Sequence, residues 1–285
     1  MKRIKDYEEL VSVLKDSGKK LVSWGGRGSL YESNVNISER VSLLSRLKSE
    51  GIATVLISNS PETAFDIKHR FKTMGYDGLL NGFYTSGMLA VRDIYQHYDR
   101  PKESTPYFVI GDVQKETVFE ASSKFHRINK PEDAIIAIAG DLNETRGGFR
   151  SPAYTADPFL DDIKECVHQR VHFWNIMPER HYSSSKWGTV ISSGSIAKEF
   201  ERLGGDVISV GKPEKYIFEW AYGDWDICSK EEIIHLGDDA VIDVAGAGNV
   251  GVDTVLLTSG FTACWMAEGL EHYLKNGGIA PTYIF

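Results

Sequence analysis

The chain has 285 residues, of which 42% are hydrophobic and 25% charged, so a disordered or fibrous protein is excluded and a core domain with an insertion fits the length. The formal net charge is -8, and the acidic residues are spread along the chain. A nucleic-acid or anionic-membrane surface would need clustered Lys and Arg, so neither partner is expected. A small phosphorylated ligand in one local pocket is compatible with this charge.

Cysteine usage and hydropathy predict a cytoplasmic protein. Cys166, Cys228 and Cys264 lie far apart without metal-ligand spacing, which favours buried thiols in a reducing compartment. Residues 1–6 turn polar at once, so no signal peptide is expected. No run of 18 apolar residues occurs, so no membrane span is expected either.

The amino-terminal part predicts alternating helices and strands. Apolar residues at helical spacing predict a helix over residues 4–14, and residues 19–24 predict a strand that runs into a Gly-rich turn. A second helix is expected to start near Ser38, its N-cap, and to stop at Gly51.

The next apolar run, residues 52–57, is typical of a central parallel strand covered on both faces. Ser60 is expected to cap the following helix and Pro61 to take its first position, and the helix ends at Gly75. Strand, turn and helix therefore repeat, which predicts a βαβ layout with right-handed crossovers.

The carboxy-terminal part again predicts alternating strands and helices. Strands are expected over residues 206–210, 233–236 and 254–257, and a helix over residues 213–221. Together with the amino-terminal part they predict a Rossmann-like α/β core.

The middle of the chain, residues 104–207, has a different character and is interpreted as an inserted α+β domain. Strand candidates are residues 108–110 and 134–138, a helix is expected between Pro158 and His168, and residues 146–156 are expected to form an irregular loop. The predicted domains are thus a core of residues 1–103 and 208–285 and an insertion of residues 104–207.

Ligands of open parallel sheets bind at the carboxyl ends of the strands. Four predicted strand ends carry polar residues or glycines: Gly25–Ser29, Ser58–Asn59, Gly211–Pro213, and Gly237–Asp239 with Asp243. A hydroxyl, a lysine and an acidic cluster at one edge would suit a phosphate and a divalent cation. Each feature also has an ordinary explanation, since a lysine before a helix is often solvated and Ser-Asn pairs often cap helices.

In these segments the sequence resembles the haloacid-dehalogenase-type (HAD) superfamily, class IIA phosphatases. Residues 211–218 look like the family motif with the phosphate-binding lysine, and residues 237–243 look like its acidic metal motif. Residues 55–59 look like the motif whose hydroxyl binds phosphoryl oxygens, and residues 192–197 are similar to the Gly-rich segment that leaves the cap domain. The resemblance implies a HAD-like three-layer core with a C2-type cap.

The family's first motif is an apolar strand followed by Asp-x-Asp-Gly-Thr/Val-Leu, and its counterpart here is residues 21–31. Gly28, Ser29 and Leu30 fix the register, so Gly25 stands at the nucleophile position and Arg27 at the general acid/base position. Glycine has no side chain to phosphorylate, and arginine does not shuttle protons because its pKa exceeds about 12.

The resemblance implies roles for further residues. Ser58, Asn59 and Lys212 correspond to phosphate-binding positions, and Asp238 and Asp243 to positions that hold Mg²⁺ in the family. The first Asp of the motif is also a magnesium ligand in the family, so its loss implies weak or absent Mg²⁺ binding here. In the cap domain, Asp141 and Asn175 follow strands and are candidates for substrate contacts, although such polar residues are often simply solvated.

Arg27 suggests a replacement for the metal. If the acidic residues converge, its guanidinium could pair with Asp238 or Asp243 as a fixed internal cation. The alternative is that Arg27 points to solvent and the acids cap the next helix.

Two Gly-rich stretches are candidates for ligand-binding loops. Residues 246–251 match GxGxxG but lie well beyond the end of the preceding strand, so dinucleotide binding is not expected there. Residues 24–28 follow a strand directly and could cradle an anion with backbone amides.

The leading hypothesis is a catalytically impaired relative of class IIA phosphatases that binds a phosphorylated metabolite or a protein partner. One alternative is an active phosphohydrolase with a non-standard nucleophile, for which Ser23, Ser29 and Ser58 are the nearby hydroxyls. Another alternative is a structural or interaction scaffold. Homodimerisation is common in relatives and is compatible with the sequence.

Overall fold

The computed structural model describes residues 1–32, 35–98, 104–111, 118–140, 142, 152–184, 188–227, 229–258 and 269–285. These residues form two compact units. The core unit comprises Met1–Ser58, Ala64–Tyr84 and Lys212–Phe285, and the inserted unit comprises Asn59–Thr63 and Thr85–Gly211. Each unit has its own sheet and its own hydrophobic clusters.

The core unit is built on a seven-stranded sheet with the order β1-β14-β13-β12-β2-β3-β4. In chain order its strands are β1 (Lys2–Arg3), β2 (Leu21–Trp24), β3 (Ala53–Ser58), β4 (Gly82–Thr85), β12 (Ile233–Gly237), β13 (Asp253–Leu256) and β14 (Tyr283–Ile284). Strands β14, β13, β12, β2 and β3 pair in parallel, as β1 does with β14. The predicted parallel α/β core is therefore confirmed.

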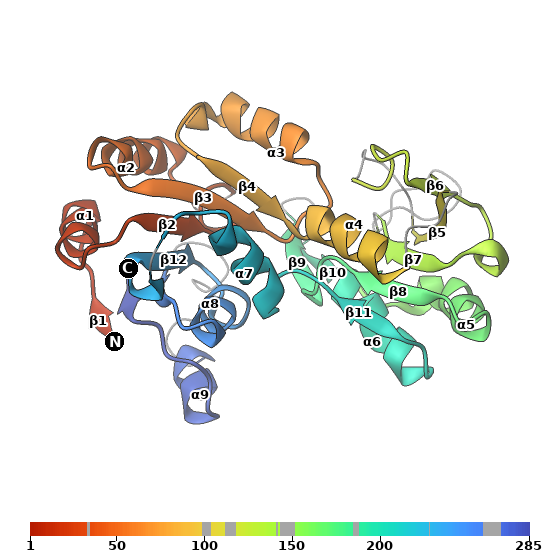
Figure 1. Ribbon diagram of the computed structural model, residues 1–285. Helices are drawn as coiled ribbons and strands as arrows, with labels where there is room; N and C mark the ends of the chain where they lie inside the picture. The colour runs from red at the N-terminus through yellow and green to blue at the C-terminus, as the bar shows by residue number, and fades with distance from the viewer. Residues whose placement is uncertain are drawn as a thin grey trace. The chain divides into compact units, whose positions relative to one another are not determined.

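Helical segments cover both faces of this sheet, and Figure 1 shows α2 and α3 on one side and α7 on the other. They are α1 (Tyr7–Asp16), α2 (Ile37–Ser49), α3 (Ala64–Phe71), η1 (Lys72–Tyr76), α7 (Lys215–Gly223), η4 (Lys230–Glu232), η5 (Ala240–Ala245), α8 (Gly246–Asn249) and α9 (Gly269–Lys275). Successive side chains of a strand point to opposite faces of the sheet. Val22 and Trp24 pack with the buried residues of α1 to α3, whereas Ser23 and His235 face Tyr222 and Phe218 of α7.

The second helix starts near Ser38 as predicted, but its predicted N-cap is wrong, and so is the predicted start of the third helix. Helix α2 is capped by Asn36, whose side chain accepts a hydrogen bond from the amide of Glu39, and not by Ser38. Helix α3 begins at Ala64 and not at Pro61, because the Pro61 carbonyl accepts a bond from Val118 and residues 59–63 belong to the inserted unit.

The boundary between the units also differs from the expected one. Strand β4 and helix α4 (Ser86–His97) carry the chain across it, and neither was predicted. Ala90 and Ile94 of α4 pack in one cluster with Tyr107 and Trp174, so α4 belongs to the inserted unit. The first core segment therefore ends at Tyr84 and not at residue 103.

The inserted unit contains a five-stranded sheet with the order β11-β8-β7-β5-β6, and all of its strand pairs are parallel. The strands are β5 (Thr105–Ile110), β6 (Phe125–Arg127), β7 (Ile136–Ala139), β8 (His172–Asn175) and β11 (Val207–Ser209). The helical segments are η2 (Pro131–Asp133), η3 (Asp157–Phe159), α5 (Leu160–His168) and α6 (Ser193–Arg202). Apart from the antiparallel ribbon of β9 (His181–Ser184) and β10 (Gly188–Ile191), the unit is α/β and not the expected α+β, because helices connect its parallel strands.

Three further predictions concern the cysteines, the loop at residues 146–156 and membrane spans. Cys166 is buried in the inserted unit, and burial raises the pKa of its thiol to about 12, whereas Cys228 and Cys264 lie outside the described residues. Most of the loop expected at residues 146–156 also lies outside them. Among the described residues, no helix has the length and apolar character needed to cross a membrane.

Candidate functional site

The carboxyl ends of three neighbouring core strands bring the predicted motifs together. Strand β2 lies between β12 and β3 and pairs in parallel with both, so the loops after Trp24, Ser58 and Gly237 leave the sheet at one edge. The amide of Gly25 donates to the carbonyl of Leu236 at 2.8 Å, which fixes the first residue of the Gly-rich loop beside β12.

Position 25 faces the acidic motif. A Cβ placed on Gly25 would lie 2.9 Å from Ser29 Oγ and 3.1 and 3.3 Å from the two carboxylate oxygens of Asp243. Any side chain at this position would therefore contact Asp243. A nucleophile at position 25 would thus lie beside the Asp243 carboxylate. Glycine leaves no reactive group there.

The Gly-rich loop uses several of its own amides. Besides Gly25, the amides of Gly28, Ser29 and Leu30 donate to backbone carbonyls within residues 26–31. These four amides are committed to holding the loop and are not offered to a ligand. Of the predicted anion cradle, residues 24–28, the amides of Gly25 and Gly28 are thus engaged within the protein, and anion binding there stays a prediction.

Gly28 is required by the backbone. Its φ is +75°, and a Cβ on it would lie 2.1 Å from Asp238 Oδ2. Both the left-handed conformation and the close approach of the carboxylate exclude a larger residue. The loop and the acidic motif are thus fitted to each other in the core unit.

Asp243 forms the centre of a buried charge network. Its Oδ1 lies 2.6 Å from Lys212 Nζ and 3.2 Å from His235 Nε2, and its Oδ2 accepts a hydrogen bond from the amide of Asp239 at 3.2 Å. The side chains of Lys212 and Asp243 are 5% and 4% exposed. Helix η5 places Asp243 here, because it turns the chain back over the end of β12.

Burial and charge act on these groups in opposite directions. Burial alone would raise the pKa of Asp243, but Lys212 and His235 outweigh it and hold this pKa below its usual value. Burial lowers the pKa of His235, although the Asp243 carboxylate opposes that shift. Asp243 therefore stays charged, and His235 favours its neutral form.

The network continues under α7. Ser23 Oγ lies 2.9 Å from His235 Nδ1 and 2.9 Å from the hydroxyl of Tyr222, and Ser23 and His235 have no exposed surface. The sequence interpretation did not include His235 or Tyr222. A histidine in the middle of the apolar strand residues 233–236 was the available signal, because a buried imidazole needs polar partners.

The other two acidic residues have different roles. Asp238 is buried and accepts a hydrogen bond from Ser29 Oγ at 3.0 Å. Asp239 accepts bonds from the amides of Val241 and Ile242 and so caps η5. Burial raises the pKa of Asp239, against the effect of these bonds. The capping explanation thus holds for Asp239.

Arg27 does not supply the cation of Asp243, and this part of the sequence hypothesis is wrong. Its Nε lies 3.3 Å from Glu32 Oε1, and the two side chains are 48% and 39% exposed. The cation that contacts Asp243 is Lys212. Arg27 stands on the outer side of the loop because Gly28 reverses the chain directly after it.

The predicted phosphate-binding residues are divided between the two units. Ser58 and Lys212 are buried in the core unit, and a Cβ on Gly26 would lie 3.2 Å from Ser58 Oγ, so this hydroxyl faces the Gly-rich loop. Asn59 belongs to the inserted unit, where its Nδ2 donates to Glu179 Oε1 at 2.8 Å. Phosphate binding by these residues stays a prediction.

The two candidate substrate-contact residues of the insertion have different outcomes. Asp141 lies outside the described residues. Asn175 is buried at the end of β8, where its Oδ1 accepts from Ser193 Oγ at 2.7 Å and its Nδ2 donates to Ser209 Oγ at 3.2 Å. Both ends of its amide are engaged within the inserted unit, and a substrate contact stays a prediction.

The donor set suits a resident divalent cation poorly. Within the described part of the chain, no group of three or more His, Cys, Asp or Glu residues is arranged to hold a metal ion. Mg²⁺ requires oxygen ligands in an octahedral arrangement. Position 25 supplies no oxygen from a side chain, and both oxygens of Asp243 already accept hydrogen bonds from protein donors.

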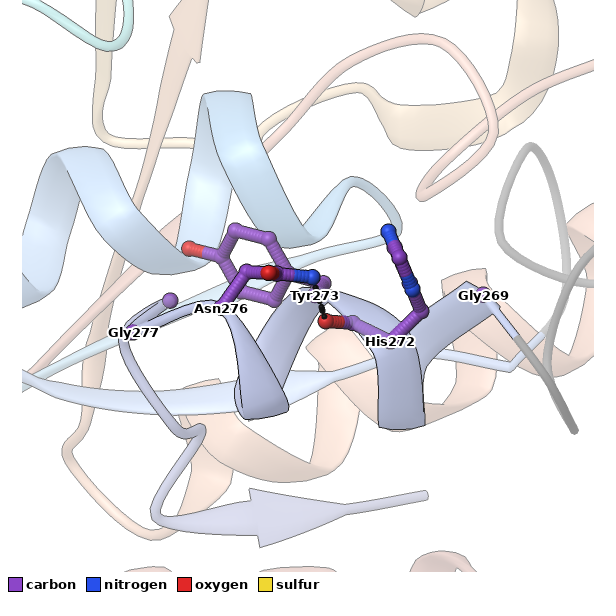
Figure 2. Close-up of a pocket in the computed structure, with 6 residues that line it drawn as sticks. Gly269, His272, Tyr273, Asn276 and Gly277 are labelled. Carbon is purple, nitrogen blue, oxygen red and sulfur yellow. Dashed lines mark hydrogen bonds between the residues drawn. The ribbon is translucent and has the colours of Figure 1, made fainter.

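Two further features lie away from these strand ends. The GxGxxG stretch begins in α8, and a Cβ on Gly246 would lie 2.6 Å from the ring of Phe218, so this glycine permits close packing against α7. Figure 2 shows an open hollow at α9, lined by His272, Tyr273 and Asn276 together with three glycines. It contains none of the predicted site residues.

A parallel α/β core interrupted by a second parallel unit, with a lysine and two aspartates at the carboxyl ends of its strands, defines a HAD-like hydrolase fold. The HAD-hydrolase-like family matches residues 209–284. The chain is 26% identical to the ribonucleotide monophosphatase NagD of Escherichia coli (strain K12) over 241 aligned residues. The alignment covers 83% of this chain and 86% of that protein. The carboxy-terminal part of the chain therefore matches the HAD-hydrolase-like family, and the chain over most of its length is similar to a HAD-type phosphatase.

Solved structures agree with this assignment at the level of the fold. A haloacid dehalogenase-like hydrolase from Brucella suis 1330 superposes with a TM-score of 0.76 at 18% identity, over 100% of this chain and 98% of that one. A possible sugar phosphatase of the HAD superfamily from Cytophaga hutchinsonii gives 0.74 at 20% identity, over 100% and 97%. The p-nitrophenyl phosphatase from Archaeoglobus fulgidus gives 0.69 at 20% identity, over 94% and 95%.

Proposed function

We propose that this chain is a HAD class IIA phosphatase-like protein that has lost Asp-based phosphoryl transfer and binds a phosphorylated metabolite or a protein partner. The observation that carries the proposal is the geometry of position 25. A side chain there would face Asp243, yet the residue is glycine and offers no nucleophile.

Arg27 supports the same conclusion at the acid/base position. A guanidinium stays protonated at any physiological pH, so it neither donates nor accepts the proton of a leaving group. Its half-exposed side chain pairs with Glu32. The nucleophile and the proton carrier of the family reaction are thus both missing.

The groups that would recognise a phosphate are retained in part. Ser58 keeps its hydroxyl toward the Gly-rich loop, and Lys212 keeps its ammonium at the same edge of the sheet. Relatives named as ribonucleotide monophosphatase and possible sugar phosphatase suggest nucleoside monophosphates and sugar phosphates as the first ligands to test. Mg²⁺ binding is proposed to be weak or absent, and the cytoplasmic location and homodimer stay predictions.

Turnover of p-nitrophenyl phosphate with Mg²⁺ is the first test. The natural chain is expected to show no release of nitrophenol above background. The double change Gly25→Asp with Arg27→Asp is expected to restore some metal-dependent hydrolysis, provided that Ser29 Oγ rotates away from the new Cβ. Rapid turnover by the natural chain would contradict the loss of phosphoryl transfer.

Ligand binding is tested separately by thermal shift with inorganic phosphate, nucleoside monophosphates and sugar phosphates. A ligand at a hundred times its Kd stabilises the folded state by about 2.7 kcal/mol, which a melting curve resolves. Ser58→Ala is expected to abolish the shift, and Ser45→Ala, at an exposed serine of α2, is the matched control. A chain that melts identically with every ligand would favour the scaffold alternative.

One contact favours the alternative of a non-standard nucleophile. Ser23 Oγ lies 2.9 Å from His235 Nδ1, so a base does stand beside one of the nearby hydroxyls. Ser23 has no exposed surface, however, and Tyr222 lies against it. Any residual hydrolysis that disappears in Ser23→Ala but persists in Ser29→Ala would establish this alternative.

A further inference from the structure

Helix α2 buries an arginine against the Gly-rich loop. Arg40 is 2% exposed, and its Nε donates to the carbonyl of Ser29 at 2.9 Å. Its Nη1 donates to the hydroxyl of Tyr7 in α1 at 2.8 Å. A buried guanidinium is unfavourable unless acceptors satisfy it, and the two acceptors here determine where the group lies.

Two aromatic rings lie against the same guanidinium. Its Cζ is 5.4 Å from the ring centroid of Tyr7 and 5.9 Å from that of Phe285, and the two centroids are 4.9 Å apart. Arginine combines flat faces that pack on rings with donors in a rigid fork, whereas lysine offers a single ammonium. The contacts of Arg40 therefore depend on the shape of its side chain and not only on its charge.

The carbonyl that Arg40 holds belongs to the return side of the Gly-rich loop. The next carbonyl, that of Leu30, accepts a hydrogen bond from the hydroxyl of Tyr76 at 2.5 Å. The amides of Ser29 and Leu30 both donate to the carbonyl of Gly26, at 3.3 and 2.8 Å. Arg40 and Tyr76 thus hold Ser29 and Leu30, and these two residues hold Gly26.

Gly26 lies where the loop retains an unused donor. In the described part of the chain its amide has no acceptor, and the hydroxyl of Ser58, which is 7% exposed, has no hydrogen-bond partner. A Cβ on Gly26 would lie 3.2 Å from Ser58 Oγ, so the two residues are neighbours. Buried donors are seldom left without partners, so this pair suits an anionic oxygen.

We propose that Arg40 is a positioning residue for an anion site at Gly26 and Ser58. Glycines at positions 25, 26 and 28 make the loop entropically unfavourable to order, so a fixed conformation needs anchors outside it. Arg40 is such an anchor, and it keeps the Gly26 amide beside Ser58 without contacting the ligand. The inference rests on the proposed function, because it names a residue that sets the affinity of the same phosphate site.

The first test is the affinity for inorganic phosphate, measured by isothermal titration calorimetry well below the melting temperature of each variant. A loop that is ordered in only a fraction of the molecules lowers the apparent affinity by that fraction. Arg40→Met and Arg40→Lys are both expected to raise the Kd at least about tenfold. Arg46→Met is the matched control, because Arg46 lies on the same helix and pairs with Glu8 of α1 at the surface. Its Kd should stay within about twofold of the natural value.

Amide hydrogen exchange tests the same contacts without a ligand. The amides of Gly28 and Leu30, which bond within the loop, should exchange at least about tenfold faster in both Arg40 variants. The amides of strand β3 should keep their rates, whereas a general loss of stability would speed both sets. Tyr76→Phe removes only the bond to Leu30 and should cause a smaller change in the same direction, so the test does not depend on the folding of an Arg40 variant.

Four results would overturn the inference. Natural phosphate affinity in Arg40→Lys would show that charge and not geometry matters. Unchanged loop exchange in the Arg40 variants would show that the loop holds itself. Equal weakening of phosphate binding in Arg46→Met, or faster exchange throughout β3, would show a general loss of stability. A natural chain that binds no phosphate, but whose loop exchanges faster in Arg40→Met, would contradict phosphate binding under the proposed function, while the positioning of the loop by Arg40 would stand.

Discussion

A buried lysine contacts an aspartate at each end of the core strands, and the surroundings of the two pairs differ. At the amino ends, Lys19 Nζ contacts Asp253 but also donates to the carbonyls of Glu231 and Ile233 at 2.6 and 3.1 Å. At the carboxyl ends, Lys212 Nζ contacts Asp243, which is buried on all sides and also engages His235.

The difference distinguishes a lysine that ties backbone segments together from one whose partner is a buried carboxylate at the candidate site. Lys19 ties the backbone before β2 to the backbone around β12, and its aspartate is partly hydrated. Lys212 instead contacts a carboxylate that is almost fully buried. Ligand sites lie at the carboxyl ends of parallel strands, so this second pair lies at the candidate functional site.

Loss of the second lysine is the largest expected effect. Lys212→Met should lower the free energy of unfolding by about 3–5 kcal/mol, because it leaves Asp243 buried without its cation. Lys19→Met should cost only about 2 kcal/mol, since Asp253 keeps water and the main loss is two hydrogen bonds to carbonyls. Urea unfolding of both variants measures the difference.

The comparison fails if Lys19→Met is the more damaging change. That result would make the amino-end pair the main structural tie and Asp243 a residue that readily takes a proton. The pH of the urea experiment should be held at 7.5, where Asp243 is charged in the natural chain.

The glycines at the two ends of β2 provide a second test. Gly28→Ala should cost about 3 kcal/mol, because a Cβ there collides with Asp238 Oδ2 in addition to the cost of its positive φ. Gly18 has a similar φ of +68° with nothing within 4 Å of the new Cβ, so Gly18→Ala should cost only about 1 kcal/mol. Equal melting temperatures for the two variants would show that Asp238 moves freely and is not fitted to the loop.

The pH dependence of stability tests the buried histidine. Ser23 of β2, Tyr222 of α7, Asp243 of η5 and Lys212 surround His235, and burial lowers its pKa in the folded state. The unfolded chain therefore takes up this proton first, so stability should fall as the pH drops below about 6.5, by at most about 1.4 kcal/mol per pH unit. Urea midpoints between pH 7.5 and 5 measure the slope.

His235→Asn should flatten this slope, because the residue no longer titrates. His272→Gln, at an exposed histidine of α9, is the matched control and should leave the slope unchanged. An unchanged slope in His235→Asn would assign the pH dependence to other groups.

Much of the core could be predicted from the sequence because most residues of its central strands are apolar and turn residues follow them. Strand β4 escaped prediction because it is only four residues long and half of it is partly exposed, and the short strands of the insertion hid its parallel sheet. A helix N-cap was misplaced where a side chain other than the expected one accepts the first amide bond, as Asn36 does.

For the candidate site, the sequence could place Lys212 and Asp243 at one edge of the sheet, but it could not pair them. Which cation meets Asp243 depends on how η5 turns back over β12 and on the direction of Arg27, which the reversal at Gly28 decides. His235 was hidden because its neighbours are apolar. Its role depends on contacts with Ser23 and Asp243, which come together only across two elements.

Arg27→Ala is expected to have the smallest effect on the free energy of unfolding. It tests most directly whether Arg27 or Lys212 is the cation of the acidic motif. The side chain pairs with Glu32 at 3.3 Å, and both partners are about half exposed, so the free energy of unfolding should change by less than about 1 kcal/mol. Glu32→Gln should cost the same, and the double variant should show a coupling energy of about 0.2–1 kcal/mol. A loss as large as that of Lys212→Met would instead mean that Arg27 neutralises the acidic motif. Because a surface ion pair is screened by salt and a buried one is not, repeating both measurements in 1 M NaCl should erase the Arg27 effect and preserve that of Lys212.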